Sequence, residues 1–169
     1  MKKAFIVIDM QNDFITGALK NKEAEKTVPK IVSAVENFDG LVIATRDTHQ
    51  TTYLSSPEGK ALPIVHCVEG TWGWQIEQSI ESAVRNKKQH KFINKPVFGT
   101  IRRWGLKGYD EIELSGTCTD ICVVSNALIL KTLYPSAKIT VHAELCSGLT
   151  PTLHEQALAV MKSCQILVD

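Results

Sequence analysis

Two cysteines four residues apart, Cys118 and Cys122, occupy the stretch of this chain best suited to chemistry. The stretch follows a strand-like run at residues 111–114 and opens a helix-like run at residues 123–133. In an open α/β sheet, ligands bind at the carboxyl ends of strands. The free N–H groups and partial positive charge of a helix N-terminus favour a thiolate. Cys122 is therefore a candidate nucleophile, although two small buried hydrophobic cysteines fit this stretch equally well.

Two further polar residues follow other strand-like runs, Asp9 after residues 4–8 and Lys95 after residues 91–94. A parallel sheet would gather these strand ends, and Cys122 with them, along one edge. There Asp9 could take the thiol proton as general base. Lys95 could lower the pKa of the carboxylate and the thiol and stabilise negative charge. Taken singly, Lys95 fits a surface lysine and Asp9 a loop-ordering carboxylate, but their coincidence with Cys122 favours a catalytic site.

A second group of candidate residues consists of Asp47, His49, Glu58 and His66. Asp47 and His49 leave the end of a strand-like run, and the other two lie in an irregular stretch at residues 50–74. A segment of that length without regular structure is usually functional in a compact domain. The nitrogen and oxygen donors suit a metal ion. Asp-x-His alone is a weak signal, and His66 is also consistent with a loop histidine whose hydrogen bonds are satisfied.

The elements that would position these residues alternate between strand-like and helix-like patterns. This alternation predicts an α/β fold with a parallel sheet covered by helices on both faces. A chain of 169 residues fits one domain spanning residues 1–169. Strands are expected at residues 4–8, 41–45, 91–94, 109–114, 138–142 and 165–168, and helices at residues 23–38, 75–87, 101–106, 123–133 and 152–163.

Composition narrows the possible partners and compartment. A formal net charge of +1 gives no electrostatic case for binding nucleic acid or an anionic membrane. No apolar run reaches transmembrane length, and the run after Met1 is too short for a signal peptide and ends at a carboxylate. The five cysteines are odd in number and scattered. These features predict free thiols and a cytoplasmic protein.

Four segments spread over the chain form a specific combination. They are FIVIDMQNDF at residues 5–14, TRDTH at residues 45–49, PIVHCVEGTWG at residues 63–73, and GTCTDICV at residues 116–123. Together they resemble the isochorismatase-like cysteine hydrolases, and especially their nicotinamidase/pyrazinamidase branch, whose signature His-Cys-x-x-Gly-Thr-x-Gly matches the third segment. The resemblance implies a three-layer α/β/α fold with a six-stranded, mostly parallel, Rossmann-like sheet.

For the catalytic centre, the resemblance implies a triad of Asp9, Lys95 and Cys122. It also implies a cis peptide bond before Cys118, with the backbone N–H groups of Cys118 and Cys122 forming an oxyanion hole. The implied reaction is hydrolysis of a small-molecule amide through a thioester on Cys122, with nicotinamide giving nicotinate and ammonia.

For the second group, the resemblance implies a divalent metal bound by the residues that match Asp47, His49 and His66. Zinc is the first expectation, with iron or manganese as alternatives, and no organic cofactor is expected. Glu58 falls where some members add a glutamate ligand. True isochorismatases lack this site, so its residues favour an amidase. The family often forms dimers or larger assemblies, which predicts a homo-oligomer.

The substrate is less closely specified than the chemistry. Phe14 and Trp72 are candidates for an aromatic pocket wall, although core packing fits both as well. Residues 50–53 read QTTY where nicotinamidases often have Pro-x-x-His-x-Ser-Phe, and residues 95–99 read KPVFG without the usual Tyr-Ser-Ala-Phe. Two alternatives stay open: hydrolysis of another small amide or carbamoyl compound, and a catalytically silent member that binds a small molecule.

Overall fold

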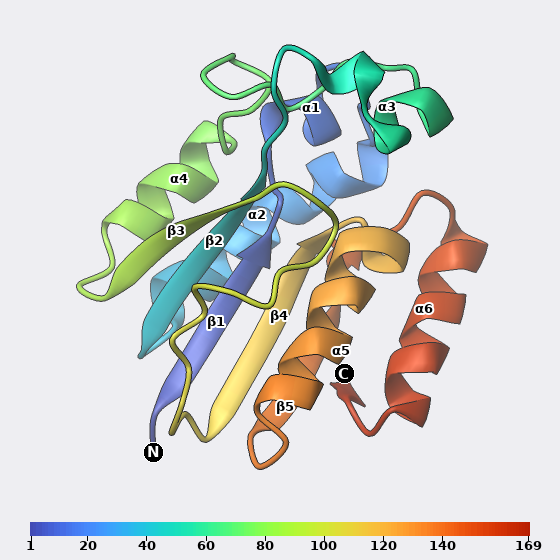
Figure 1. Cartoon of the computed structure of the whole chain (residues 1–169). Coiled ribbons are helices and arrows are strands. Elements are labelled where there is room, and N and C mark those ends of the chain that lie inside the picture. The colour runs from blue at the N-terminus through green and yellow to red at the C-terminus, as the bar shows by residue number, and fades with distance from the viewer.

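A six-stranded sheet runs through the centre of the computed structural model, which describes residues 1–169 (Figure 1). All neighbouring strands pair in parallel, in the order β3-β2-β1-β4-β5-β6. The predicted six-stranded parallel sheet is therefore confirmed, and the helices on its two faces complete the predicted three-layer α/β/α fold. The strands are β1 (Lys3–Ile8), β2 (Leu41–Asp47), β3 (His90–Lys95), β4 (Glu111–Thr117), β5 (Lys138–Ser147) and β6 (Leu167–Val168).

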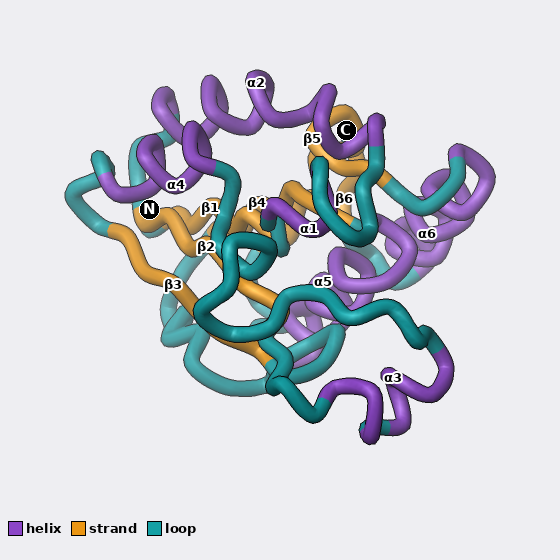
Figure 2. Tube along the Cα trace, turned by 90° about the horizontal axis from the view of Figure 1, so that it is seen from above, coloured by secondary structure: helices purple, strands orange, loops and turns teal.

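The helices cover both faces of this sheet. Two short helical turns also occur, a 3₁₀ turn η1 (Tyr53–Ser55) and a π-helical turn η2 (Thr119–Val123) that runs into α5. Figure 2, seen from above, places α2 and α4 on one side of the sheet and α5 on the other. The helices are α1 (Asn12–Ile15), α2 (Lys22–Asn37), α3 (Pro57–Ala61), α4 (Gln78–Arg85), α5 (Val124–Leu133) and α6 (Pro151–Ser163).

The apolar run of β1 is buried on both faces because successive side chains of a strand point to opposite sides. Phe5 and Val7 pack with α2 and α4 in one hydrophobic cluster. Ile6 and Ile8 pack with α5 and α6 in the other. β1 thus lies at the centre of the molecule and fixes the position of whatever follows Ile8.

The chain changes direction around β1, and this creates the crevice for the site. From β1 the chain moves outward through β2 and β3, then returns to place β4 on the other side of β1. Such a switch point opens a crevice at the carboxyl ends of the two central strands. Asp9 follows one of these strands and the η2 turn follows the other.

Several elements differ from those expected. Residues 101–106 form no helix, because the backbone is left-handed at Arg103 (φ 70°) and Gly105 (φ 67°). The irregular stretch at residues 50–74 contains η1 and α3, and the side chain of Ser56 caps α3 by accepting the Gly59 N–H. None of the helices combines the length and apolar character needed to span a membrane.

Candidate active site

Three predicted site residues meet at the carboxyl edge of the sheet. The ammonium Nζ of Lys95 lies 2.6 Å from Oδ2 of Asp9 and 3.6 Å from Sγ of Cys122. Asp9 and Lys95 are completely buried, and Cys122 is 6% exposed. An acid, an ammonium group and a thiol from three separate elements therefore form one buried cluster.

Thr45 on β2 fixes the orientation of Asp9. Its hydroxyl donates to Asp9 Oδ1 at 2.6 Å and accepts the Asp9 backbone N–H at 3.1 Å. Asp9 itself has a left-handed backbone with φ 48°. The other carboxylate oxygen, Oδ2, forms the buried ion pair with the Lys95 ammonium at 2.6 Å.

Burial and charge set the protonation states of this cluster. Burial raises the pKa of Asp9, although the Lys95 ammonium opposes this. Burial alone would lower the pKa of Lys95, but the charges of Asp9, Cys122 and Asp47 raise it above its usual value. Lys95 therefore stays protonated beside Asp9.

The pKa of the Cys122 thiol is raised, whereas the start of a helix was expected to lower it. Burial raises its pKa well above the usual value and the Asp9 charge adds to this, while Lys95 acts in the opposite direction. Cys122 lies inside the η2 turn, and burial is the largest influence on its pKa. The resting group is a thiol, so its proton has to leave when the sulfur attacks.

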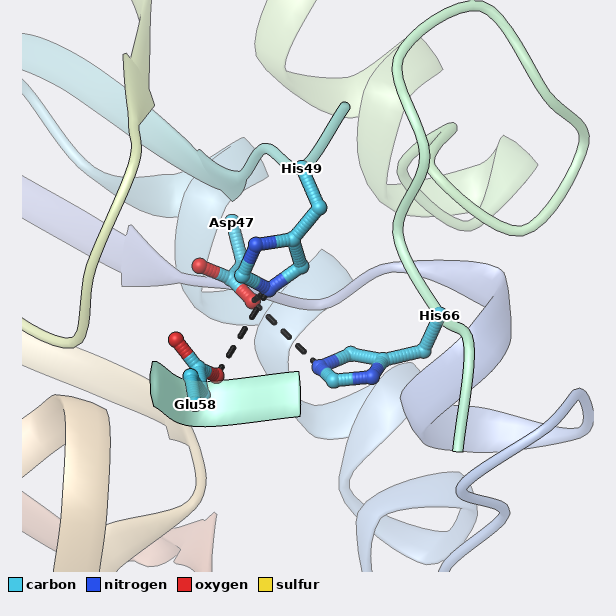
Figure 3. Close-up of side chains that lie close together, drawn as sticks. All are labelled: Asp47, His49, Glu58 and His66. Carbon is cyan, nitrogen blue, oxygen red and sulfur yellow. Dashed lines mark ion pairs between the residues drawn. The ribbon is translucent and has the colours of Figure 1, made fainter. Parts of the chain in front are cut away.

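The second predicted group also converges, as Figure 3 shows. One potential ligand atom from each of Asp47, His49, Glu58 and His66 lies within 4.8 Å of the others. Nε2 of His49 lies 2.8 Å from Asp47 Oδ2 and 3.6 Å from Glu58 Oε1. Nε2 of His66 lies 3.7 Å from the same Asp47 oxygen. The cluster joins the end of β2 to α3 and to the loop that follows it.

The donor atoms of this cluster fit a divalent metal. His49 Nε2 is buried without a hydrogen-bond partner, despite its closeness to Asp47. His66 Nδ1 lies 2.8 Å from the carbonyl oxygen of Ile64, so Nδ1 carries the hydrogen and Nε2 directs a lone pair into the cluster. Burial would raise the pKa of Asp47, but the two histidines and Lys95 hold it well below its usual range.

A cavity of about 480 Å³ connects the two clusters. Cys122 opens onto it from one cluster, and Asp47, Glu58 and His66 from the other. A substrate in this cavity would contact the thiol and the ligand cluster together. Its apolar lining includes Phe14, Leu19, Leu62, Phe98, Ile121 and Leu149.

Known proteins are similar in sequence to nearly the whole length of this chain. The family model described as the isochorismatase domain matches residues 3–169. The chain belongs to the isochorismatase family. The nicotinamidase of Schizosaccharomyces pombe is 28% identical over 98% of this chain and 91% of its own length.

Solved structures of the isochorismatase family agree with the fold. The crystal structure of the nicotinamidase/pyrazinamidase from Bacillus subtilis superposes with a TM-score of 0.86 at 28% identity and covers 99% of both chains. The pyrazinamidase of Pyrococcus horikoshii in complex with zinc gives a TM-score of 0.82 at 27% identity, covering 100% of this chain and 99% of the other.

The prediction that Trp72 forms a pocket wall is wrong. Its side chain is 58% exposed and lies in a separate surface depression beside α1. Asn12 Nδ2 donates to the Trp72 carbonyl, and Gly73 packs against the Asp13 carboxylate, which holds this segment against α1. Phe14, the other predicted residue, does line the cavity, with its ring centroid 5.7 Å from that of His66.

Several wall residues were not identified from the sequence. Leu62, Phe98 and Leu149 all come from segments between regular elements. No periodic pattern marks such positions, because their contacts are made with segments far away in the chain. The position of Phe98, three residues after Lys95, is the one clue in the sequence.

The turn that carries Cys122 begins with the cis peptide bond that the family resemblance implies. The peptide bond between Thr117 and Cys118 is cis. Burial raises the pKa of the Cys118 thiol to about 11, so Cys118 is a protonated neighbour of Cys122 in the cavity lining. The oxyanion role of the Cys118 and Cys122 N–H groups stays a prediction.

Proposed function

We propose that this protein is a nicotinamidase, which hydrolyses the carboxamide of nicotinamide to nicotinate and ammonia. The observation that carries the proposal is the cavity that joins the Cys122 thiol to the Asp47 cluster, with Asp9 and Lys95 beside the thiol. The relatives described above as nicotinamidases and pyrazinamidases act on amides of aromatic rings and support the same substrate class.

In the first step, the Cys122 sulfur attacks the amide carbon while its proton passes to Asp9. The raised pKa of the thiol requires this transfer, and the neighbouring Asp9, whose own pKa is raised by burial, accepts the proton. The electron pair of the carbonyl double bond moves to oxygen, where the N–H groups of Cys118 and Cys122 stabilise it. Lys95 offsets the negative charge that builds up beside Asp9.

In the second step, the carbon–nitrogen bond breaks and ammonia leaves with the proton that Asp9 received. A thioester on Cys122 remains. Asp9, again a carboxylate, accepts a proton from the water that attacks the thioester carbon. The Cys122 sulfur then leaves, regains a proton, and nicotinate is released.

We infer that Asp47, His49 and His66, with Glu58 as a fourth donor, hold a divalent metal beside the cavity. Their nitrogen and oxygen donors suit zinc, with iron or manganese as alternatives. When bound, such a metal supplies a Lewis-acid position for a substrate ring nitrogen or a water. Asp47 also accepts a hydrogen bond from Lys95 Nζ at 3.5 Å, which links the ligand cluster to the triad.

Ammonia release from nicotinamide and pyrazinamide tests the proposal, with an aliphatic amide as a comparison substrate. We expect release by the native protein and none above background by Cys122→Ala. Equal rates for the two proteins would rule out the thioester mechanism. Release from the aliphatic amide alone would keep the mechanism and reject nicotinamide as the substrate.

A further inference from the structure

One wall of the cavity is formed by Phe98, whose backbone is held by a buried residue outside the proposed triad. Phe98 lies in the loop that follows Lys95, and its side chain is 45% exposed. Asn126 lies under this loop on α5, one helical turn after Cys122. Asn126 is completely buried, so a loss of its hydrogen bonds would leave polar groups without water to replace them.

The side chain of Asn126 joins the loop to the nucleophile. Its Nδ2 donates to the carbonyl oxygen of Cys122 at 2.7 Å and to that of Phe98 at 3.0 Å. Its Oδ1 accepts the backbone N–H of Thr100 at 3.1 Å. Both amide hydrogens and the amide oxygen of Asn126 are therefore hydrogen-bonded. The bonds to Phe98 and Thr100 lie on either side of Gly99 in the chain.

That intervening residue, Gly99, lies directly against α5. A Cβ atom at Gly99 would come 2.6 Å from Cδ1 of Ile129 and 3.3 Å from Cβ of Ser125. A side chain there would force either the loop or the end of the Ile129 side chain to shift. On the other side of Phe98, Lys95 Nζ donates to the Val97 carbonyl at 3.3 Å. The short loop is thus fixed both to α5 and to the lysine of the proposed triad.

We propose that Asn126 is a positioning residue that holds Phe98 as the wall against which an aromatic substrate packs, with Gly99 allowing the close approach. Asn126 acts through Phe98 and takes no part in bond making or breaking. The identity of the substrate in this inference rests on the proposed nicotinamidase function. Loss of one well-placed aromatic contact weakens binding by about fivefold, so this change falls on KM.

Kinetics with nicotinamide provide the first test. We expect Asn126→Ala and Gly99→Ala each to raise KM about fivefold while kcat stays within about threefold. Ile129→Val removes the Cδ1 atom that the new Cβ would meet, so the double variant Gly99→Ala/Ile129→Val should regain the native KM. Ile129→Val alone is the matched control. A merely structural role would lower kcat or the folded fraction and not raise KM alone, and a native KM in folded Asn126→Ala protein would overturn the proposal.

A second measurement does not depend on turnover. Cys122 is alkylated with iodoacetamide or with its N-phenyl derivative, and labelling is read by peptide mass spectrometry against the exposed Cys164. The preference of Cys122 for the aromatic reagent should fall about fivefold in Asn126→Ala and Gly99→Ala, and return in the double variant. If Asn126→Ala does not fold, the comparison of Gly99→Ala with Gly99→Ala/Ile129→Val tests the proposal.

The two proposals fail in distinguishable ways. An unchanged reagent preference would overturn the role of Asn126, whether or not nicotinamide is hydrolysed. A changed preference in a protein that releases no ammonia from nicotinamide would support Asn126 as the positioning residue and reject only the nicotinamidase function.

Discussion

The proposed triad and the ligand cluster meet at one cavity through Cys122 and are linked by Lys95, but they are built in different ways. Asp9 and Lys95 lie at the ends of strands β1 and β3, and both are completely buried. In the ligand cluster, only Asp47 belongs to a strand, whereas Glu58 and His66 come from the segment between β2 and α4. The sheet therefore fixes one half of the site, and loop contacts fix the other.

The loop contacts behind the ligand cluster can be identified. Asp13 Oδ2 accepts the backbone N–H of Cys67 at 2.7 Å, and Cys67 has a left-handed backbone with φ 47°. This bond sets the direction of His66, the preceding residue. Changes in the loop half should leave the sheet half intact. Changes at Lys95 should damage both, because its Nζ contacts both Asp9 and Asp47.

The largest expected effect comes from removing the Cys122 thiol, and the neighbouring Cys118 provides the comparison. Cys122→Ala should lower kcat/KM for nicotinamide by at least about 10⁴-fold, because no other group can form the thioester. Cys118→Ala should lower it by about tenfold or less, because Cys118 is expected to act through its backbone N–H. Ammonia release by folded samples, checked by circular dichroism, measures both. Comparable losses would show that the roles of the two cysteines are wrongly divided.

Removing the shared lysine should affect activity and stability together. Lys95→Met leaves Asp9 and Asp47 buried without a counter-charge, so we expect about a 10³-fold loss of kcat/KM and a loss of about 3–5 kcal/mol in the free energy of unfolding. Urea titration measures the second quantity.

A second ion pair with the same N–O distance provides the control for Lys95→Met. Lys3 and Glu111 also approach to 2.6 Å, but the Lys3 side chain is 36% exposed. Lys3→Met should therefore lower the free energy of unfolding far less than Lys95→Met does. Similar losses in the two variants would mean that burial does not distinguish these ion pairs.

The loop half can be disturbed separately. His66→Ala should reduce the bound divalent metal, measured by elemental analysis, and lower kcat/KM by about 100-fold. Alkylation of Cys122 by iodoacetamide should stay within about threefold of the native rate, because the strand ends that hold Asp9 and Lys95 are unaffected. Native metal content in His66→Ala would remove this residue from the ligand set, and a lost Cys122 reactivity would show that the halves are not independent.

The same division explains what the sequence could predict. Residues at strand ends, such as Asp9 and Lys95, are predictable because a parallel sheet places those ends together whatever the loops do. The gathering of His49 with His66 required the family resemblance, because no local pattern places a loop residue in space. The orientation of Asp9 by Thr45, the raised pKa of the Cys122 thiol and the place of Phe98 depend on contacts between distant segments.

The smallest effect tests the aromatic wall, where sequence and structure disagree. Phe14→Ala should raise KM for nicotinamide about tenfold, because the ring lines the cavity beside His66. Trp72→Ala should change KM by less than about twofold, because Trp72 lies in another depression and more than half of its side chain is in solvent. Steady-state kinetics of both variants measure this difference. A large rise in KM for Trp72→Ala would mean that the loop carrying Trp72 moves onto the bound substrate, and the loop half of the site would then be assembled by substrate binding.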